Sequence, residues 1–590
     1  MNWKIILFWL LVFTGLSFFF FTFASYTFDQ QEEMQLFIPE WGAIWTQLVF
    51  PGNFIRIMGL WVTQYYVYPL PAAMINAALL CSTGFVCYIL LQRIADKNNN
   101  ALLSLFPVVT LLKYHIQLKY VADGAWGLLI MLLIIAGVLS LHNRQTRLMA
   151  SSASALLIFW IAGQLVILYG ILLVAIEYLL YPSKKIVIST ISLLLGCIVA
   201  YIGIRYILML PLTDGFYDKA YHDAQMQSDS YVYYVWIRFT ILVLVLLGTV
   251  RLLSLIKRET SIKRYFVTGG IITCFLVFTG YFLPDRYDVQ NRMMDRMAYL
   301  ARRQHWDEII GMHYGKKIPG AVNRNFLNMA LAQKGALGNR LFYFDQKGPQ
   351  SLLTSYNGSY YMSILLSDIH FMIGDISLSE TYALEALTLA RRGGSPRAIQ
   401  RMIQISLLRQ EWELARKYLL ILKQLPYYQQ WAMHYESLMR HPKKIANDPD
   451  LKGKHLPEQE NTLLGMLDMD IIWKEHLTDS AMNRIAYEYM GCSYLLAKET
   501  GMFKDFLLRT AQLSVEQPLP LHFQEAAVMI LADDPASLNT FPIDSSVKQK
   551  YITYLAMEAK NQQSKGHLAA MYEQFGNTFW FYYQYKDIGK

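Results

Sequence analysis

Long apolar runs separated by short polar connections dominate the first half of the sequence. The first run, Ile5–Phe23, has the length of about 20 residues that an α-helix needs to cross a ~30 Å hydrocarbon core. Leu102–Leu112 is shorter and contains Pro107, which favours a re-entrant segment. Residues 1–284 are therefore predicted to form an all-α, polytopic membrane domain of about nine spans. The other eight runs are Leu70–Leu91, Leu102–Leu112, Trp126–Leu141, Met149–Ala162, Leu165–Tyr181, Ile186–Leu208, Tyr234–Leu255 and Tyr265–Leu283.

Basic residues in the short connections predict the orientation. They cluster at Arg93/Lys97, Arg144/Arg147, Lys184/Lys185 and Lys257–Arg264. Cytoplasmic loops are enriched in Lys and Arg, so each stretch between two clusters is expected to leave the cytoplasm and return. The apolar stretch 149–181 must then break near Gly163. After nine spans, everything beyond Leu283 is expected outside the cytoplasm, which for a bacterial inner membrane is the periplasm.

Three segments of the membrane domain are expected on that outer face: the loop 25–68, a turn at Lys113–Asp123 and the loop 211–232. The first loop is rich in aromatic residues that settle at the depth of the lipid headgroups. Their spacing predicts one or two helices lying flat on the bilayer. These aromatic residues are Trp41, Trp45, Trp61, Tyr65, Tyr66 and Tyr68.

Apolar positions in the second half, residues 285–590, recur with a helical period. Turns are predicted near Gln304, Gly335, Gly374 and Gln410, at intervals of 31 to 39 residues. The segment that follows Gln410 resembles the second helix of a tetratricopeptide repeat, because the small Ala415 is followed by apolar residues and a closing Pro426. Trp412 and Tyr418 are expected to pack between helices. The pattern predicts a degenerate, tetratricopeptide-like solenoid of helical hairpins.

The last segment, FGNTFWFYYQYK, carries six aromatic residues between Phe575 and Tyr583. We expect a final helix packed on the rest of the protein. The alternative interpretation is an aromatic platform that binds a sugar or a peptide.

The amino-acid composition supports the division into a membrane domain, residues 1–284, and a soluble second half, residues 285–590. Only 16% of the residues are charged, against about a quarter in soluble domains. Residues 1–284 contain 18 Lys+Arg and 12 Asp+Glu, and residues 285–590 contain 35 and 32. The net charge of +9 thus comes mainly from the connections of the membrane domain, which argues against a nucleic-acid partner. The five cysteines form no CxxC pair and are interpreted as small buried apolar residues.

No compact catalytic or nucleotide-binding motif occurs in the sequence. The strongest candidates for catalysis are Asp29, Glu32 and Glu33, which follow the first span directly. Carboxylates this close repel one another, which favours a shared proton or a bound divalent cation. Deprotonating an acceptor hydroxyl requires such a carboxylate within hydrogen-bonding distance. The alternative is an ordinary solvated loop.

The other outer segments supply candidates for substrate binding. Arg205 and Arg238 flank the loop 211–232, and an arginine at headgroup depth is suited to a lipid phosphate. His222 and Asp223 within that loop form an adjacent metal or acid–base pair. Lys119 and Asp123, in the turn Lys113–Asp123, are expected to lie at the outer face beside the loop 211–232. Glu177 is expected to make a helix-packing contact.

The acidic first loop, the interfacial aromatic segment and the soluble second half together resemble the GT-C class of membrane glycosyltransferases. That resemblance implies a polyprenyl-phosphate-linked sugar as donor and transfer at the outer face. It assigns Asp29 as base or metal ligand, with Glu32 or Glu33 as a second carboxylate. The usual signature is one acid closely followed by another, which DQQEE only approximates.

Two other function classes compete with this interpretation. A membrane-anchored scaffold would use the helical second half to recruit a protein partner and would perform no chemistry. A transporter of lipid-linked glycans would place charges in the middle of its spans, but the apolar runs contain almost none. The glycosyltransferase and scaffold hypotheses differ in one respect. Only the enzyme needs a single lipid-facing cavity at which Asp29, the acids of 214–229 and the two arginines lie together.

Overall fold

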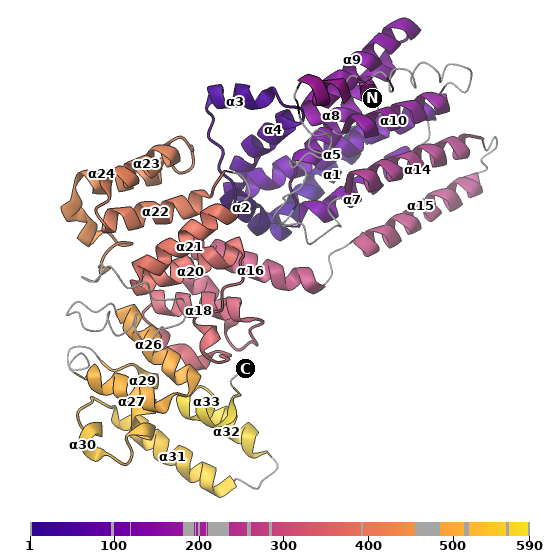
Figure 1. Ribbon diagram of the computed structural model, residues 1–590. Helices are drawn as coiled ribbons and strands as arrows, with labels where there is room; N and C mark the ends of the chain where they lie inside the picture. The colour runs from indigo at the N-terminus through magenta and orange to yellow at the C-terminus, as the bar shows by residue number, and fades with distance from the viewer. Residues whose placement is uncertain are drawn as a thin grey trace. The chain divides into compact units, whose positions relative to one another are not determined.

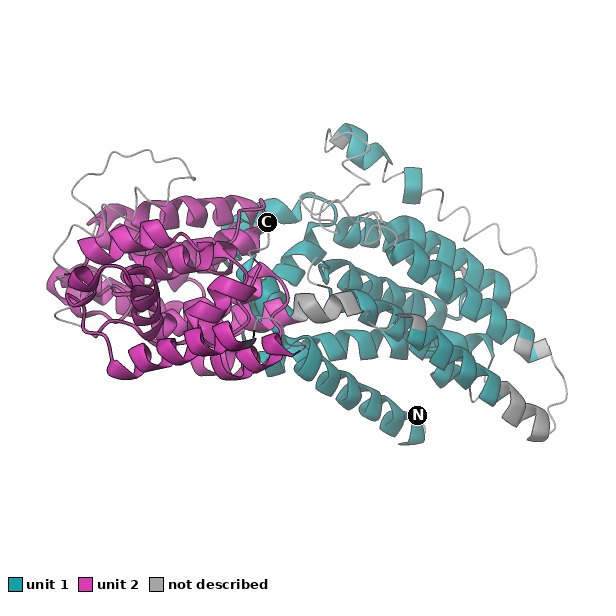
Figure 2. Cartoon of the chain, turned by 90° about the horizontal axis from the view of Figure 1, so that it is seen from below, with its two compact units in different colours: residues 1–288, 391–393 teal, residues 289–390, 394–590 magenta. Residues whose placement is uncertain are grey.

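A computed structural model describes residues 3–95, 99–117, 120–163, 165–180, some positions between 194 and 209, 235–255, 261–282, 286–390, 393–454, 484–511, 518–561 and 566–587. The chain divides into two compact units (Figure 2). Unit 1 comprises residues 1–288 and 391–393, and unit 2 comprises residues 289–390 and 394–590. The described residues form helices and no β-strand, which confirms the all-α prediction.

Unit 1 is a bundle of helices centred on α5 (Figure 1). Helix α5 packs against α1, α2, α7, α8, α10 and α14. The helices of this unit are α1 (Trp3–Phe23), α2 (Ser25–Glu33), α3 (Trp41–Leu48), α4 (Asn53–Thr63), the 3-10 helix η1 (Gln64–Val67), α5 (Pro69–Ile94), α6 (Asn100–Leu103), α7 (Leu105–His115), α8 (Asp123–Ser140), α9 (Arg144–Ala162), α10 (Leu165–Leu180), the π-helical turn η2 (Gly203–Ile207), α14 (Val235–Leu255) and α15 (Ser261–Phe282).

Four described helices are long and apolar enough to cross a membrane: α1, α5, α8 and residues Val235–Leu252 of α14. Leu165–Leu180 and Thr268–Gly280 form shorter apolar helices. These lengths and compositions are those of a membrane protein. The predicted span Ile186–Leu208 lies largely outside the described residues, and the predicted re-entrant segment forms the short helices α6 and α7.

The predicted break in the apolar stretch 149–181 is confirmed. Helix α9 ends at Ala162, and Gly163 follows with a φ of +52°. Few residues other than glycine adopt this conformation, which ends the helix. Helices α9 and α10 then pack against each other. The Arg147 Nε lies 3.1 Å from the Glu177 Oε1, so Glu177 makes the helix-packing contact that was expected.

Two helices of the first outer segment expose aromatic side chains. No residue of α3 is buried, and Trp41 and Trp45 are 71% and 65% exposed. Helix α4 buries Ile55 and Leu60 against α8 and α9 but leaves Trp61 exposed. Both helices therefore have the apolar outer face expected of interfacial helices.

Unit 2 consists of helices that mostly pack on their neighbours in the chain (Figure 1). Helix α16 crosses the division between the units. The helices are α16 (Arg286–Arg302), α17 (Trp306–His313), α18 (Ala321–Gln333), α19 (Leu337–Arg340), η5 (Leu341–Tyr343), η6 (Pro349–Ser351), α20 (Tyr360–Ile373), α21 (Ile376–Leu389), α22 (Pro396–Leu408), α23 (Trp412–Lys423), α24 (Gln429–Arg440), η7 (Pro442–Asn447), α26 (Arg484–Ala497), α27 (Thr500–Arg509), α29 (Leu521–Ile530), α30 (Pro535–Leu538), α31 (Ser545–Asn561), α32 (His567–Phe575) and α33 (Phe579–Tyr585).

The four predicted turn positions are all confirmed by the backbone. Gln304, Gly335, Gly374 and Gln410 adopt φ values between +57° and +95°, and each separates two consecutive helices. At every one of these turns the next amide donates to the carbonyl five residues earlier, as from Glu411 N to Ser406 O at 2.8 Å. This bond is that of a Schellman motif, which closes a helix on a left-handed residue. Lys498, with a φ of +58°, makes the same turn between α26 and α27.

Packing within α23 differs in part from the prediction. Ala415 and Leu419 are buried as expected, but Trp412 and Tyr418 are only half-buried. Trp412 is the first residue of α23, directly after the turn. A side chain at the first position of a helix has no preceding helical turn to pack on, which leaves it partly in solvent.

The aromatic C-terminal segment is packed inside unit 2. Phe579, Trp580, Phe581 and Tyr582 of α33 are all buried. The Glu525 carboxylate accepts the Phe579 amide at 2.8 Å, and the Glu525 carbonyl accepts the Trp580 indole at 2.7 Å. The packed-helix prediction is confirmed. The alternative interpretation, an aromatic platform that binds a sugar or a peptide, stays a prediction, because Phe581 and Tyr582 also line a cleft in unit 2.

Candidate functional site

The three carboxylates that follow the first span lie on a buried helix. Helix α2 begins at Ser25, two residues after α1 ends, and packs against η1, α5, α1 and α4. Asp29, Glu32 and Glu33 are 1%, 4% and 6% exposed. The solvated-loop interpretation is therefore wrong. All three have interaction partners, as buried carboxylates require.

Helix α2 is fastened to the segment between α7 and α8. The Gln31 Nε2 donates to the carbonyls of Gln117 and Tyr120 at 3.2 and 3.1 Å. Phe28 of the same helix packs against Tyr66 of η1, with ring centroids 5.0 Å apart and ring planes tilted by 47°. These contacts hold α2 between η1, which precedes α5 in the sequence, and the segment between α7 and α8, which follows it.

Asp123 brings a fourth buried carboxylate to this region. It is the first residue of α8, is 1% exposed, and lies against α4 at Gly59. A Cβ atom at Gly59 would stand 1.8 Å from the Asp123 Oδ1, so only glycine admits the carboxylate. A carboxylate at the first turn of a helix also gains from the helix dipole.

Two buried tyrosines surround Asp123. The Tyr66 hydroxyl donates to the Asn76 Oδ1 at 3.0 Å. Burial raises the pKa of Tyr66 and of Tyr120 above the ordinary value, and the nearby Asp123 charge raises each further. Both phenols therefore remain protonated at neutral pH.

Arg238 contacts the same segment from α14. Its Nη1 donates to the Tyr114 hydroxyl at 3.3 Å, and Tyr114 is packed beside Tyr120 with ring centroids 6.0 Å apart. The helix that carries the predicted acids, through Gln31, and the predicted phosphate-binding Arg238, through Tyr114, thus both contact the residues that link α7 to α8. Residues 114–117 and 120–123, together with α2, Tyr66 and Arg238, are called the polar cluster below.

The structure brings only some of the predicted residues together. Arg205 is exposed on η2 and makes no polar contact with the described part of the chain. Lys119, His222 and Asp223 lie outside the described residues. Within the described residues no group of three or more His, Cys, Asp or Glu is arranged to hold a metal ion. The divalent cation therefore stays a prediction.

Several buried polar groups in the polar cluster have no hydrogen-bond partner in the described residues. They are both amide atoms of Gln30, the Nε2 of His115 and the Tyr120 hydroxyl. Buried polar groups are normally hydrogen-bonded, so the burial of these atoms carries a desolvation cost that no hydrogen bond within the described residues offsets. Sequence analysis missed all three residues. The tyrosine- and histidine-rich turn KYHIQLKY, at the end of a short helix, was the available signal.

Comparison with known proteins identifies a protein family. A family model described as a family of unknown function, DUF6057, matches residues 1–586. No curated protein and no solved structure matches the chain. The family match covers the helices of both units.

Proposed function

We propose that this chain, which belongs to the family of unknown function DUF6057, is a membrane glycosyltransferase or oligosaccharyltransferase. It would move a sugar from a polyprenyl-phosphate donor to a glycan, lipid or protein acceptor at the outer face of the membrane. The observation that carries the proposal is the burial of the three α2 carboxylates on a helix that Gln31 ties to the segment before α8, a segment that Arg238 also contacts through Tyr114. Buried carboxylates are costly to desolvate, and such groups concentrate at functional sites.

In this proposal Asp29 takes the proton from the acceptor hydroxyl while the hydroxyl oxygen attacks the anomeric carbon of the donor sugar. The bond between that carbon and the lipid phosphate breaks, and the phosphate leaves with the electron pair. Arg238 stabilises the negative charge on the departing phosphate. Glu32 or Glu33, which lie close to Asp29 in the sequence, supplies the second carboxylate.

The finer features of the topology belong to the same proposal. The basic connections support nine spans, a bacterial inner membrane and a periplasmic second half. The recurring left-handed turns and the sequential packing of α20 to α24 support a tetratricopeptide-like solenoid. Arg205, Lys119, His222 and Asp223 are kept as further candidates for substrate binding.

Replacing Asp29 by Asn tests the enzyme. Loss of a general base lowers a rate by about 10²- to 10⁴-fold, so Asp29→Asn is expected to abolish a cell-envelope glycan or glycoprotein that also disappears in the null strain. Glu40→Gln is the matched control, because Glu40 is the next acid along the chain and is exposed. Normal glycosylation with Asp29→Asn, at parental protein level, would contradict the enzymatic role.

The alternative function is a membrane-anchored scaffold. The sequential packing of the helical hairpins in unit 2 favours it, since stacked hairpins commonly present surfaces for protein partners. A scaffold tolerates Asp29→Asn and also the Glu32→Gln/Glu33→Gln double variant. Normal glycosylation with both, together with loss of a co-purifying protein when unit 2 is altered, would favour the scaffold.

A further inference from the structure

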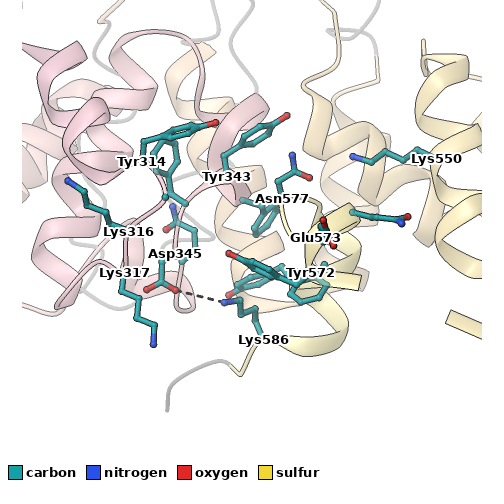
Figure 3. A pocket seen from close by; sticks show the side chains of 18 residues that line it. Tyr314, Lys316, Lys317, Tyr343, Asp345, Lys550, Tyr572, Glu573, Asn577 and Lys586 are labelled. Atoms are coloured by element: carbon teal, nitrogen blue, oxygen red, sulfur yellow. Dashed lines mark ion pairs between the residues drawn. The ribbon is translucent and has the colours of Figure 1, made fainter. Parts of the chain in front are cut away.

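An open cleft of about 760 Å³ lies entirely within unit 2 (Figure 3). Segments that are distant in sequence form it: the residues after α17, η5 with the residues that follow it, the end of α32 with the next turn, and residues in and directly after α33. Lys550 of α31 reaches toward the cleft from one side. The cleft contains none of the residues of the polar cluster.

The floor of the cleft is held by buried hydrogen bonds. Arg324 donates to the carbonyls of Ile318 and Asp345 at 2.7 and 2.9 Å, which joins the first two segments. The Tyr582 hydroxyl accepts the Gly348 amide at 3.0 Å and donates to the Leu496 carbonyl at 2.9 Å. A floor fixed in this way binds a ligand without first having to be ordered.

Tyrosine rings project from the walls. Tyr314 and Tyr572 are 61% and 60% exposed, although each ring rests on a buried phenylalanine. The ring centroids are 6.1 Å apart for Tyr314 and Phe344, and 5.6 Å apart for Tyr572 and Phe581. The contact with the buried phenylalanine therefore holds each tyrosine ring in place, while much of the ring stays exposed to solvent. Tyr343 is also exposed in the same wall.

Gly576 fixes the position of Tyr572. A Cβ atom at Gly576 would stand 2.4 Å from the Tyr572 carbonyl oxygen and 2.8 Å from the Cδ2 of its ring. The turn after α32 can therefore approach the ring only because residue 576 is glycine. Asn577, directly after it, presents a side-chain amide to the cleft.

The charge of the cleft is positive. Four lysines line it, Lys316, Lys317, Lys550 and Lys586, against two carboxylates, Asp345 and Glu573, which leaves a net charge of +2. Asp345 is already occupied, because its carboxylate lies 4.0 Å from the Lys586 Nζ and 3.8 Å from the Arg324 Nη2. A cleft with a net positive charge attracts anionic ligands.

We propose that this cleft binds an anionic saccharide. The exposed faces of Tyr314 and Tyr572 pack against the C–H faces of sugar rings, because an aromatic ring offers an apolar face and a polar hydroxyl edge. The lysines bind carboxylate or phosphate groups on the sugar as point charges, and Asn577 binds hydroxyls. An acidic peptide is the weaker fit, since the cleft offers neither an open strand edge nor an apolar helix groove. This inference does not depend on whether unit 1 transfers a sugar.

Affinity electrophoresis of the full chain in detergent tests the proposal. The gel contains polygalacturonate for carboxylate groups, a phosphomannan for phosphate groups, neutral dextran, or polyglutamate. Retardation by at least one anionic polysaccharide, and not by dextran or polyglutamate, is expected; which polysaccharide binds identifies the anionic group. Retardation should fall as salt is raised, because the lysines are exposed. No retardation by either anionic polysaccharide, or equal retardation by polyglutamate, would overturn the proposal.

Variants separate the rings from the charges. Tyr572→Ala is expected to weaken binding about two- to tenfold, whereas Tyr572→Phe retains it because the ring face remains. Lys316→Gln/Lys317→Gln should weaken binding, and Lys417→Gln, an exposed lysine on α23 remote from the cleft in sequence, should not. Tyr314→Ala, in a segment outside any helix, provides a second ring variant if Tyr572→Ala misfolds. If the lysine variant loses binding to the anionic polysaccharide but neither alanine variant does, the lysines bind any polyanion without help from the tyrosine rings. That result would contradict the proposal.

Discussion

At the residue scale, the polar cluster depends on close contacts between buried polar groups and small neighbours. Asp123 occupies the space beside Gly59, Tyr66 uses Asn76 as its acceptor, and Gln31 ties α2 to the segment before α8. Buried polar groups are costly when their partners are lost, so small changes here are expected to have large effects.

Gly59→Ala is expected to destabilise unit 1. The added methyl group would overlap the Asp123 carboxylate, and such overpacking typically costs about 1–3 kcal/mol. Gly137→Ala is the matched control, because Gly137 is also in a helix and has open space around its Cβ position. Thermal unfolding of both variants in detergent measures the difference. Equal melting temperatures would contradict the packing of Asp123 on α4.

Lys454 makes the stability of unit 2 depend on pH. Burial, and secondly the Arg401 charge, lowers the pKa of Lys454 from 10.5 to about 8, and its Nζ lies over the Phe371 ring at 4.9 Å. Between about pH 8 and 10.5 the unfolded chain therefore binds more protons at this residue than the folded chain, so stability rises with pH.

Lys454→Met is expected to remove this contribution. The gain in melting temperature of the variant over the parent should be largest near pH 7 and shrink by pH 9.5. Lys452→Met serves as control, because Lys452 is exposed two residues away. A constant difference between Lys454→Met and the parent across this range would show that Lys454 does not titrate with a lowered pKa.

At the element scale, burial rather than residue type decides which aromatic residues stabilise unit 2. Helix α33 has seven residues, too few to be stable alone. It is held by Glu525 and by the packing of Trp580 against Tyr551 and Tyr554, with ring centroids 4.9 and 5.7 Å apart. Trp412, at the start of α23, is only half-buried.

Trp580→Ala is therefore expected to cost more stability than Trp412→Ala. Truncation of a fully buried Trp costs about 3–5 kcal/mol, and Trp580 also loses the hydrogen bond from its indole to the Glu525 carbonyl. The half-buried Trp412 should cost less than that. Denaturant unfolding of the two variants gives the comparison. A smaller effect at Trp580 would show that α33 is not part of the cooperative core.

At the scale of the whole molecule, the basic connections of the membrane domain predict where the second half lies. The prediction of an odd number of spans puts everything beyond Leu283 outside the cytoplasm. A fusion after Leu283 to a reporter active only in the periplasm is therefore expected to be active, and one active only in the cytoplasm to be inactive. The opposite result would remove the outer-face location that the proposed transferase requires.

Local signals in the sequence were sufficient to predict many of the helices and the turns between them. Apolar length predicted α1, α5 and α8, the stretch 149–181 revealed its break at Gly163, and the turns at Gln304 and Gly374 were placed correctly. Each of these features is encoded within a few turns of helix. Helical period, span length and left-handed turns depend on neighbouring residues alone, so they can be read without knowing the fold.

Only the tertiary structure decided which polar residues are buried together. Asp29, Glu32 and Glu33 lie on a helix with little apolar character of its own, and they are buried because η1 and α5 cover them. The same holds for Asp123 against Gly59, for Arg238 beside Tyr114, and for the tyrosines and lysines of the cleft in unit 2. In each case the contacting groups are tens to hundreds of residues apart in the sequence. The sequence by itself determined the helices and their ends, whereas the packing of distant segments determined where charge is desolvated and so where chemistry or binding can occur.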